Sequence, residues 1–430
     1  MKAKSVFAVV LLMHVRLFAS GELDDAFVAH EWGTFTSVQG ADGIQLEWNP
    51  LVTTELPKFV YDRGRPNGNL RLPRYSDYAS KSAFVALQRM ETPVIYFYSG
   101  RERNVDVTVN FPQGVVTEWF PQVAKYEPHS IRWEHLQVFP RAANTKLTDL
   151  LPTDASGSHY FAARETDSDF LLAKNDFGSK RTAEYEKLLF YRGVGQFKAP
   201  LQVTLGGNED ILFLKNTGTE PLSHLYVLYL RHGKGKYVYV PSLPAGREQS
   251  VNLLLERGQS ELSDLRPRLA KDMAASLVRE GLFDREASAM VKTWNDSWFG
   301  EEGLRVLYTL PRTWTDRILP LTISPQPSGL ARVMVGRAEM ITPVMEWELM
   351  KQITRYSEGD SQIKEQAVTN TVDLGLGRFT EAAIRRLVSR MPSRDFSRTA
   401  WNFLEAVSIR SREQPKAPAS QPARKLALAK

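Results

Sequence analysis

Residues 105–111 read Val-Asp-Val-Thr-Val-Asn-Phe, with an apolar side chain at every second position. Successive side chains of a β-strand point to opposite faces, so this alternation predicts a strand with one face in a core and the other in water. Phe111-Pro112-Gln113-Gly114 then places proline at the second position of a type I turn. A strand that ends in this way is typical of an antiparallel sheet with one solvated face.

Strand signals of this kind recur between turn residues from Phe27 to Leu255. The stretch Pro93–Tyr98 is apolar at every position, which is typical of a strand covered on both faces. We therefore predict a mainly β protein with α (α+β). It is built on one or two antiparallel β-sandwiches of immunoglobulin-like style, at residues 22–184 and 185–255. A β-barrel would produce a similar pattern.

The periodicity changes after Glu256. Apolar residues at helical spacing predict a helical pair at residues 256–300, and strand patterns return at residues 301–340. Thr342-Pro343 combines an N-cap residue with proline at the first helical position. We expect these residues to open a helical C-terminal region at residues 341–410.

The two ends of the chain differ from this body. Residues 1–21 combine a basic start, an apolar run and small residues, which fits a secretory signal peptide. No later stretch approaches the ~20 apolar residues that a spanning helix needs, so we expect no transmembrane segment in the mature chain. Residues 411–430 have little apolar content and are predicted to form a disordered basic tail. These features predict a soluble protein that is periplasmic or secreted.

Most of the positive charge lies in these two ends. The net charge is +6, of which +3 belongs to residues 1–21 and +4 to residues 411–430, leaving −1 for residues 22–410. This distribution gives no support for a basic face, and we expect no nucleic-acid partner. The chain has no cysteine, which excludes disulfides, thiol chemistry and thiolate metal sites.

The segment His30–Thr36 holds the densest group of chemically active side chains. His30 and the adjacent Glu31 are candidate catalytic residues, because such groups can act as acid, base or metal ligand. Adjacent residues of a strand point to opposite faces, however, which argues against a pair at one site. The alternative is a packed strand in which Trp32 and Phe35 lie in a core and His30 bonds to the backbone.

His129 and His135 are further candidate catalytic residues, grouped with His159, Glu118 and Glu134. If residues 131–135 form one uninterrupted strand, His135 is buried and needs a partner. That partner is either a metal ion or an ordinary hydrogen-bonding group of the core. The spacing forms no paired ligand motif, so whether a metal binds stays unknown.

Three more residues are candidates for ligand binding. Arg89 and Glu91 lie two residues apart, so they can share a sheet face and grip a polar ligand, or else form a surface ion pair. Trp32 is the third, because an exposed aromatic ring can stack on the face of a sugar. Core packing is the alternative for this ring.

Several common catalytic motifs are absent from the sequence. There is no Gly-x-Ser-x-Gly elbow and no Gly-x-x-x-x-Gly-Lys phosphate loop. Asp167-Ser168-Asp169 begins like a calcium loop but lacks the later glycine and glutamate. These absences argue against nucleotide-dependent catalysis, and we expect no cofactor.

Five segments together resemble an uncharacterised family of exported bacterial proteins that carry an N-terminal His-Glu-Trp-Gly-Thr-Phe segment. The segments span most of the mature chain and are His30–Thr36, Arg89–Tyr98, Leu189–Gly195, Trp298–Pro311 and Arg332–Arg337. The resemblance implies export. That family has no assigned activity, fold or catalytic residues, so the resemblance implies nothing about mechanism.

Two hypotheses for the function follow. The first is an exported soluble binding or structural protein of the bacterial envelope, with a glycan or another envelope protein as its partner. The alternative is a glycan or peptide hydrolase that uses a histidine/carboxylate or metal site drawn from His30, Glu31, His129 and His135. A pocket shared by His30, a later histidine and a carboxylate would favour the enzyme, and scattered histidines would oppose it.

Overall fold

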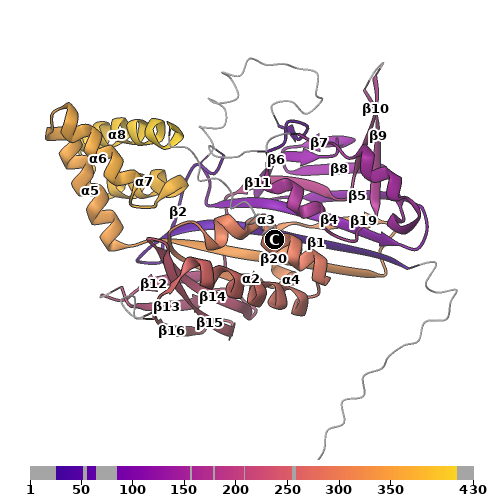
Figure 1. Ribbon diagram of the computed structural model, residues 1–430, viewed down its shortest axis with the longest axis horizontal. Helices are drawn as coiled ribbons and strands as arrows, with labels where there is room; N and C mark the ends of the chain where they lie inside the picture. The colour runs from indigo at the N-terminus through magenta and orange to yellow at the C-terminus, as the bar shows by residue number, and fades with distance from the viewer. Residues whose placement is uncertain are drawn as a thin grey trace, which may run out of the picture.

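The computed structural model in Figure 1 describes most of the chain. Its described residues are 26–51, 56–63, 85–154, 157–177, 180–207, 209–253 and 258–413. The predicted signal peptide, residues 1–21, and residues 414–430 of the predicted tail lie outside them.

A central sheet organises the fold, and within the described residues it has eleven strands. Its order is β17-β15-β14-β18-β20-β1-β4-β11-β6-β3, with β2 paired to β1. The strands of this sheet are β1 (Phe27–Gly40), β2 (Gln45–Leu46), β3 (Tyr61–Asp62), β4 (Gln88–Ser99), β6 (Gly114–Phe120), β11 (Leu189–Gly195), β14 (Leu222–Arg231), β15 (Lys234–Leu243), β17 (Ser260–Glu261), β18 (Gly303–Leu310) and β20 (Gly329–Ile341).

The long strand β1 lies near the middle of this sheet. It pairs in parallel with β20, from Val28 opposite Gly329 to Gly40 opposite Ile341, and antiparallel with β4. Every residue of β1 except Val28 is buried, as expected for a strand covered on both faces. The sheet thus joins strands that the sequence assigned to residues 22–184, 185–255 and 301–340. Those boundaries mark changes in local pattern and do not separate sheets.

A second sheet, of six strands in the described residues, contains the stretch that alternates in the sequence. In β5 (Arg103–Asn110), Val105, Val107 and Val109 are buried, and the polar residues between them are partly exposed, which confirms the predicted half-buried strand. Val107 belongs to the same hydrophobic cluster as Ile95 of β4, so the two sheets share a core. The other strands of this sheet are β7 (Lys125–Glu127), β8 (Ser130–Phe139), β9 (Phe170–Phe177), β10 (Lys180–Glu186) and β19 (Leu321–Ser324).

A smaller sheet completes the β part of the structure. It consists of β12 (Leu201–Leu205), β13 (Ile211–Asn216) and β16 (Glu248–Asn252), with β13 in the middle. Leu201 and Leu214 from this sheet join the same hydrophobic cluster as Ile95, so all three sheets are layers around one core. Figure 1 shows the second and third sheets on opposite sides of the central strands β1, β4 and β20.

The predicted helical pair is present as α2 (Leu262–Arg279) and α3 (Asp284–Phe299), and Figure 1 draws it in front of the central sheet. Leu269 and Met273 of α2 bury their side chains in a cluster that includes Tyr226 of β14. A short helix, α4 (Arg312–Ile318), precedes β19. Three 3-10 helices, η1 (Arg141–Ala143), η2 (Thr145–Leu150) and η3 (His159–Arg164), connect β8 to β9.

The C-terminal helices gather at one end of the molecule (Figure 1). They are α5 (Pro343–Glu358), α6 (Ser361–Val372), the 3-10 helix η4 (Gly377–Phe379), α7 (Thr380–Arg390) and α8 (Arg394–Glu413). The hydroxyl of Thr342 accepts a hydrogen bond from the N–H of Met345 at 3.3 Å, which confirms the predicted N-cap. Helix α8 continues three residues into the segment predicted as tail. None of the helices in the described ranges combines the length and apolar content that crossing a membrane requires.

The fold is therefore a mixture of α and β, with antiparallel sheets followed by C-terminal helices, as the sequence predicted at this level. Among the strands of the described residues, the long β1–β20 pair is the parallel one. A parallel pair needs a long connection between its strands, and here the connection is the segment between Gly40 and Gly329.

Candidate functional site

A cavity of about 900 Å³ lies where the central sheet meets α3, η3 and the connection between α6 and α7. Such junctions between structural units are common places for ligand sites. The lining comes from five parts of the chain: Arg89 and Glu91 of β4; residues 157–159, Phe161, Ala162 and Glu165 around η3; Arg192 of β11; residues 292–294, 296, 297, 301 and 302 from α3 onward; and residues 375–379.

The floor of the cavity coincides with irregular strand pairing. The β1–β4 register shifts between Trp32 and Thr34, and the β11–β6 register shifts between Arg192 and Gly193. There β4 has two residues, Thr92 and Pro93, opposite the single residue Gly33 of β1, and Thr92 has a positive φ of 42°. Bulges of this kind re-aim side chains and are common beside functional sites.

Arg89 and Glu91 both lie on the cavity floor. They therefore share one face of the sheet, as their two-residue spacing predicted. Both are almost fully buried, at 3% and 2% exposure, so they are not the surface ion pair that was the alternative interpretation. Nε of Arg89 lies 3.2 Å from Oε1 of Glu91, but outside hydrogen-bonding geometry. Burial lowers the pKa of Arg89 to about 9, and the positive charges of Arg192 and Arg378 act in the same direction.

Glu91 is the carboxylate at the centre of this floor. It accepts hydrogen bonds from the hydroxyl of Thr36 at 2.7 Å and from Nη1 of Arg378 at 2.5 Å. Burial by itself would raise the pKa of Glu91, but the charges of Arg378 and Arg89 outweigh it and hold the pKa well below its usual range. Glu91 is therefore ionised at neutral pH. We call Arg89, Glu91, Arg192 and Arg378 the Glu91 cluster.

Arg192 approaches the same floor from β11. Its Nη2 lies 3.2 Å from Nε2 of His159, and since a guanidinium only donates, the histidine nitrogen accepts. Burial, reinforced by the charge of Arg192, lowers the pKa of His159 to about 3. His159 is therefore neutral, with its proton on Nδ1. Burial also lowers the pKa of Arg192 itself, against the attraction of Glu118 and Glu91.

The guanidinium groups of the Glu91 cluster have more donors than the described residues have acceptors for them. Nε and Nη1 of Arg192, Nε and Nη2 of Arg378 and Nε of Arg89 are buried without a hydrogen-bond partner in the described part of the chain. Each buried donor left without a partner costs about 1–3 kcal/mol. An acceptor from outside the protein would remove this cost.

The other carboxylates that line the cavity already have partners. Glu165 pairs with Lys292 at 2.5 Å, Asp296 with Arg266 at 2.5 Å and Glu301 with Arg337 at 2.6 Å. Glu302 accepts the backbone N–H of His232 at 2.7 Å. Glu165, Asp296 and Glu301 are thus paired with cations. In the Glu91 cluster, Arg89 and Arg378 lie beside the carboxylate of Glu91, and Arg192 is attracted by both Glu118 and Glu91.

Aromatic rings form part of the cavity wall. Trp294 of α3 lies against His159, with ring centroids 5.2 Å apart. The guanidinium of Arg378 lies 4.9 Å from the ring centroid of Phe379. The cavity can therefore accept a group that is charged at one end and apolar at the other.

The structure separates His30 from Glu31. Nδ1 of His30 lies 2.7 Å from Oε2 of Glu286, whereas Glu31 accepts hydrogen bonds from the hydroxyl of Tyr191 and from Nε of Arg332. The two side chains thus leave β1 on opposite faces, as strand alternation requires. Neither lines the cavity.

His135 is not buried, and the prediction that placed it on the core face of one uninterrupted strand is wrong. Between Trp133 and Leu136, β8 has two residues where β5 has the single residue Asp106, so a bulge changes the alternation. His135 sits at the bulge with a positive φ of 53°, and its side chain is 86% exposed.

The remaining histidine candidate also has partners of its own. His129 lies in the turn before β8, where its Nδ1 is 2.5 Å from the backbone oxygen of Gly114. His30, His129 and His135 have no contact partner in common. Within the described ranges, no three histidine, aspartate or glutamate side chains are grouped as a metal site requires.

Trp32 is fully buried and packs against Tyr96, with ring centroids 6.2 Å apart. Trp48, Trp119 and Trp133 are buried as well. The core packing given as the alternative thus accounts for these rings in the strand-rich half, and no ring among them is free to stack on a sugar.

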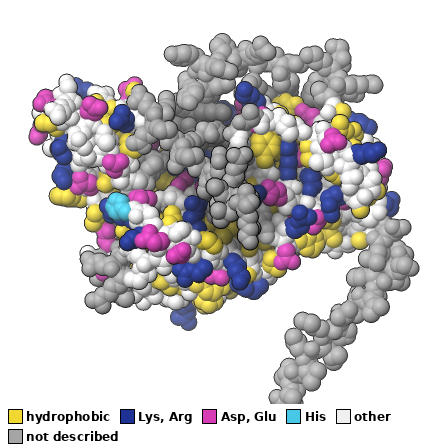
Figure 2. Space-filling view, in the orientation of Figure 1, with side chains coloured by type: hydrophobic (Ala, Val, Ile, Leu, Met, Phe, Trp, Pro, Cys, Tyr) yellow, Lys and Arg dark blue, Asp and Glu magenta, His cyan; other side chains and the backbone are white. Residues whose placement is uncertain are grey.

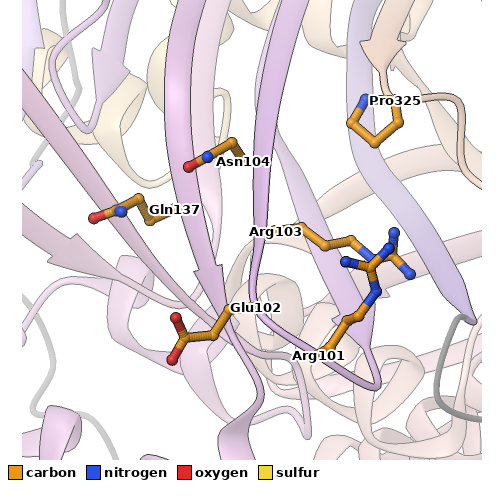
Figure 3. Close-up of a pocket in the computed structure, with 6 residues that line it drawn as sticks. All are labelled: Arg101, Glu102, Arg103, Asn104, Gln137 and Pro325. Atoms are coloured by element: carbon orange, nitrogen blue, oxygen red, sulfur yellow. The ribbon is translucent and has the colours of Figure 1, made fainter.

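A second hollow, of about 330 Å³, lies at the turn between β4 and β5. Figure 3 shows its six lining residues, and the carboxylate of Glu102 points away from the guanidinium groups of Arg101 and Arg103. This hollow is exposed and lacks the buried charges of the larger cavity. On the face drawn in Figure 2, basic and acidic side chains are interspersed.

Sequence reasoning missed several residues of the cavity. Arg192 lies within a segment that resembles the exported family, but the local pattern marks it only as a strand residue. Arg378 follows Gly375-Leu376-Gly377, which lies between two helical patterns. The two glycines were the signal for a loop with an unusual backbone conformation at this place.

Comparisons with known proteins identify no family. No family model matches the chain, and no curated protein matches it. Among solved structures, the yeast delta-COP-I mu-homology domain complexed with Dsl1 WxWxV peptide is similar over 74% of this chain and 98% of that chain, with 6% identity and a TM-score of 0.28. A likeness at that TM-score carries no argument about fold or function.

Proposed function

We propose that this protein is an exported binding protein that holds an anionic ligand in the cavity above the Glu91 cluster. One observation carries the proposal: Arg89, Arg192 and Arg378 line the cavity and retain five buried guanidinium nitrogens without hydrogen-bond partners in the described residues. Buried cations are usually paired, so an uncompensated group at a cavity favours an anionic partner from outside.

The size and place of the cavity support a ligand rather than a structural ion pair. A volume of about 900 Å³ is within the range of small-molecule sites, and the mixture of aromatic wall and charged floor is typical of them. An anion bound there would accept several charge-assisted hydrogen bonds, each worth roughly 1.5–3 kcal/mol.

The competing hydrolase has less support. It required His30 and a later histidine to meet a carboxylate in one pocket, and the three predicted histidines have separate partners. His159 does line the cavity, but its lowered pKa of about 3 keeps it neutral and acting as an acceptor for Arg192. A general acid or base works best with a pKa near the operating pH.

Export to the periplasm or the medium is part of the proposal. The basic, apolar and small-residue order of residues 1–21 supports it. A glycan bearing an acidic group, or an envelope protein with an exposed acidic terminus, would be a fitting partner. The immunoglobulin-like topology of the sheets stays a prediction.

The test is anion-dependent thermal stability of the purified full chain in inorganic phosphate and in citrate. A specific anion at 100 times its Kd is expected to stabilise the fold by about 2.7 kcal/mol. Arg192→Met should remove this effect, and Arg398→Met, at a position with a 75% exposed side chain, should retain it. If neither anion stabilises the wild type, or if both variants respond equally, the proposal is wrong.

A further inference from the structure

The loop between α6 and α7 has an unusual backbone. Gly375 has a φ of +75°, Leu376 a φ of −65° with a ψ of −29°, and Gly377 a φ of +49°. The three residues thus alternate between left-handed, right-handed and left-handed conformations. Successive N–H groups in such an alternation point to the same side and form a concave nest that binds anions.

The donors of this nest are available. The N–H of Gly375 is bonded to the carbonyl of Val372 and that of Phe379 to the carbonyl of Leu376. The N–H groups of Leu376, Gly377 and Arg378 donate to no acceptor in the described part of the chain. The eleven-residue helix α7 begins immediately afterwards, so the positive end of its dipole adds to the same region.

An independent observation also points to a ligand at this place. Arg192 comes from β11, is 2% exposed and lines the same cavity as residues 375–379, yet its Nε and Nη1 have no partner among the described residues. Arg89 and Arg378 line the cavity too. Side-chain donors from the sheet and backbone donors from the loop therefore border one space.

We propose that the ligand's anionic group is a phosphate, free or as a monoester, and that Gly375–Arg378 cradles it. This inference rests on the proposed function and narrows the anion. A carboxylate offers two oxygens in one plane, which a single guanidinium can satisfy. A phosphate offers oxygens in several directions, and the donors here come from several elements, namely β4, β11 and the η4 loop.

The acidic side of the loop limits where the phosphate can lie. A Cβ built on Gly375 would be 3.3 Å from Oε2 of Glu302, so that carboxylate borders the glycine. A Cβ on Gly377 would meet nothing within 4 Å, so the backbone there opens to space. The cradle is therefore the part around Gly377 and Arg378, away from Glu302.

The test compares phenyl phosphate with benzoate, which share a ring and differ in the shape of the anion, together with inorganic phosphate alone. Binding to the full chain is measured by isothermal titration calorimetry. Phenyl phosphate should bind at least about tenfold more tightly than benzoate, as the loss of one charge-assisted hydrogen bond predicts.

Position 377 offers a matched pair of variants. Gly377→Asn keeps the left-handed backbone because asparagine tolerates it, and should retain phosphate affinity. Gly377→Val opposes that conformation and should weaken phosphate binding about tenfold or more while leaving benzoate binding unchanged. If Gly377→Val does not fold, Gly377→Ala replaces it, since its Cβ has the same open space.

The outcomes separate the two proposals. If benzoate binds as tightly as phenyl phosphate, or if Gly377→Val binds phosphate like the wild type, the phosphate cradle is wrong. Loss of benzoate binding in Arg192→Met would then still support an anion-binding protein. If the wild type binds none of the three anions, both proposals are overturned.

Discussion

Two groups of arginines, one fully buried and one lining the cavity, differ in how their N–H groups are used. In the Glu339 cluster, formed by Arg305, Arg337, Glu301 and Glu339, every guanidinium nitrogen of the two arginines donates to an acceptor. Nε, Nη1 and Nη2 of Arg305 bond to Glu339, to the carbonyl of Trp298 and to the carbonyl of Glu302.

Arg337 in that cluster bonds to Glu339, Ser297 and Glu301 in the same way. The Glu91 cluster instead retains five guanidinium nitrogens without partners in the described residues, on Arg89, Arg192 and Arg378. A network with all donors satisfied holds the fold together. A network that borders a cavity and has donors without acceptors can bind an anionic ligand. The following variants test this difference between the two clusters.

The largest effect is expected from Glu339→Gln. It leaves Arg305, which is fully buried, without its carboxylate, and breaking a buried pair in this way costs about 3–5 kcal/mol. Urea denaturation at pH 7 measures the change. The matched control is Glu381→Gln, which removes the helix-surface pair with Arg385 and should cost about 0.5 kcal/mol or less. Equal losses in the two variants would contradict the structural role of the Glu339 cluster.

Glu91→Gln should destabilise the protein by about 2–3 kcal/mol at neutral pH, because the bonds from Thr36 and Arg378 lose their charge. The pKa of Glu91 is lowered in the folded state. Its contribution is therefore complete above the unfolded pKa of about 4.3 and is lost as the pH falls further.

The difference in the free energy of unfolding between Glu91→Gln and the wild type should accordingly become smaller below pH ~4. Urea denaturation at pH 7 and pH 3.5 measures this. A difference that stays constant or widens toward acid would show that the carboxylate is not held ionised by its arginines.

Arg192→Met should change the stability of the ligand-free protein by only about 1 kcal/mol in either direction, since it removes one hydrogen bond, to His159, together with two nitrogens that lack partners in the described residues. Arg305→Met, which leaves Glu339 with Arg337 as its remaining arginine partner, should cost more, about 3 kcal/mol. Denaturation of both variants in phosphate-free buffer gives the comparison. A loss at Arg192 as large as that at Arg305 would mean that both clusters serve only the fold.

The smallest effect is expected from replacing His129 and His135 together by alanine. Both side chains are exposed and lie outside the cavity lining, so stability should change by about 0.5 kcal/mol or less. Anion binding measured by calorimetry should not change. Loss of binding in this double variant would connect the histidines to the cavity after all.

The local sequence pattern was sufficient to predict a feature wherever that feature depends only on residues close by in the sequence. The alternation in residues 105–111 predicted a half-buried strand, and Thr342-Pro343 predicted a helix start that the structure has. Arg89 and Glu91 were placed on one face by their spacing alone. The prediction that His135 is buried was wrong because it depended on strand pairing. A bulge opposite Asp106 of β5 adds one residue to β8 and changes the alternation there.

The amino-acid order by itself determined the kinds of element and their succession, because the period of apolar residues is set by backbone geometry within a few residues. The tertiary structure alone decided that β1 pairs with β20 and that Arg89, Arg192, Trp294 and Arg378 border one cavity. These residues belong to four separate elements. Their meeting depends on strand pairing and helix packing across hundreds of residues, which leave no periodic trace in the sequence around any one of them.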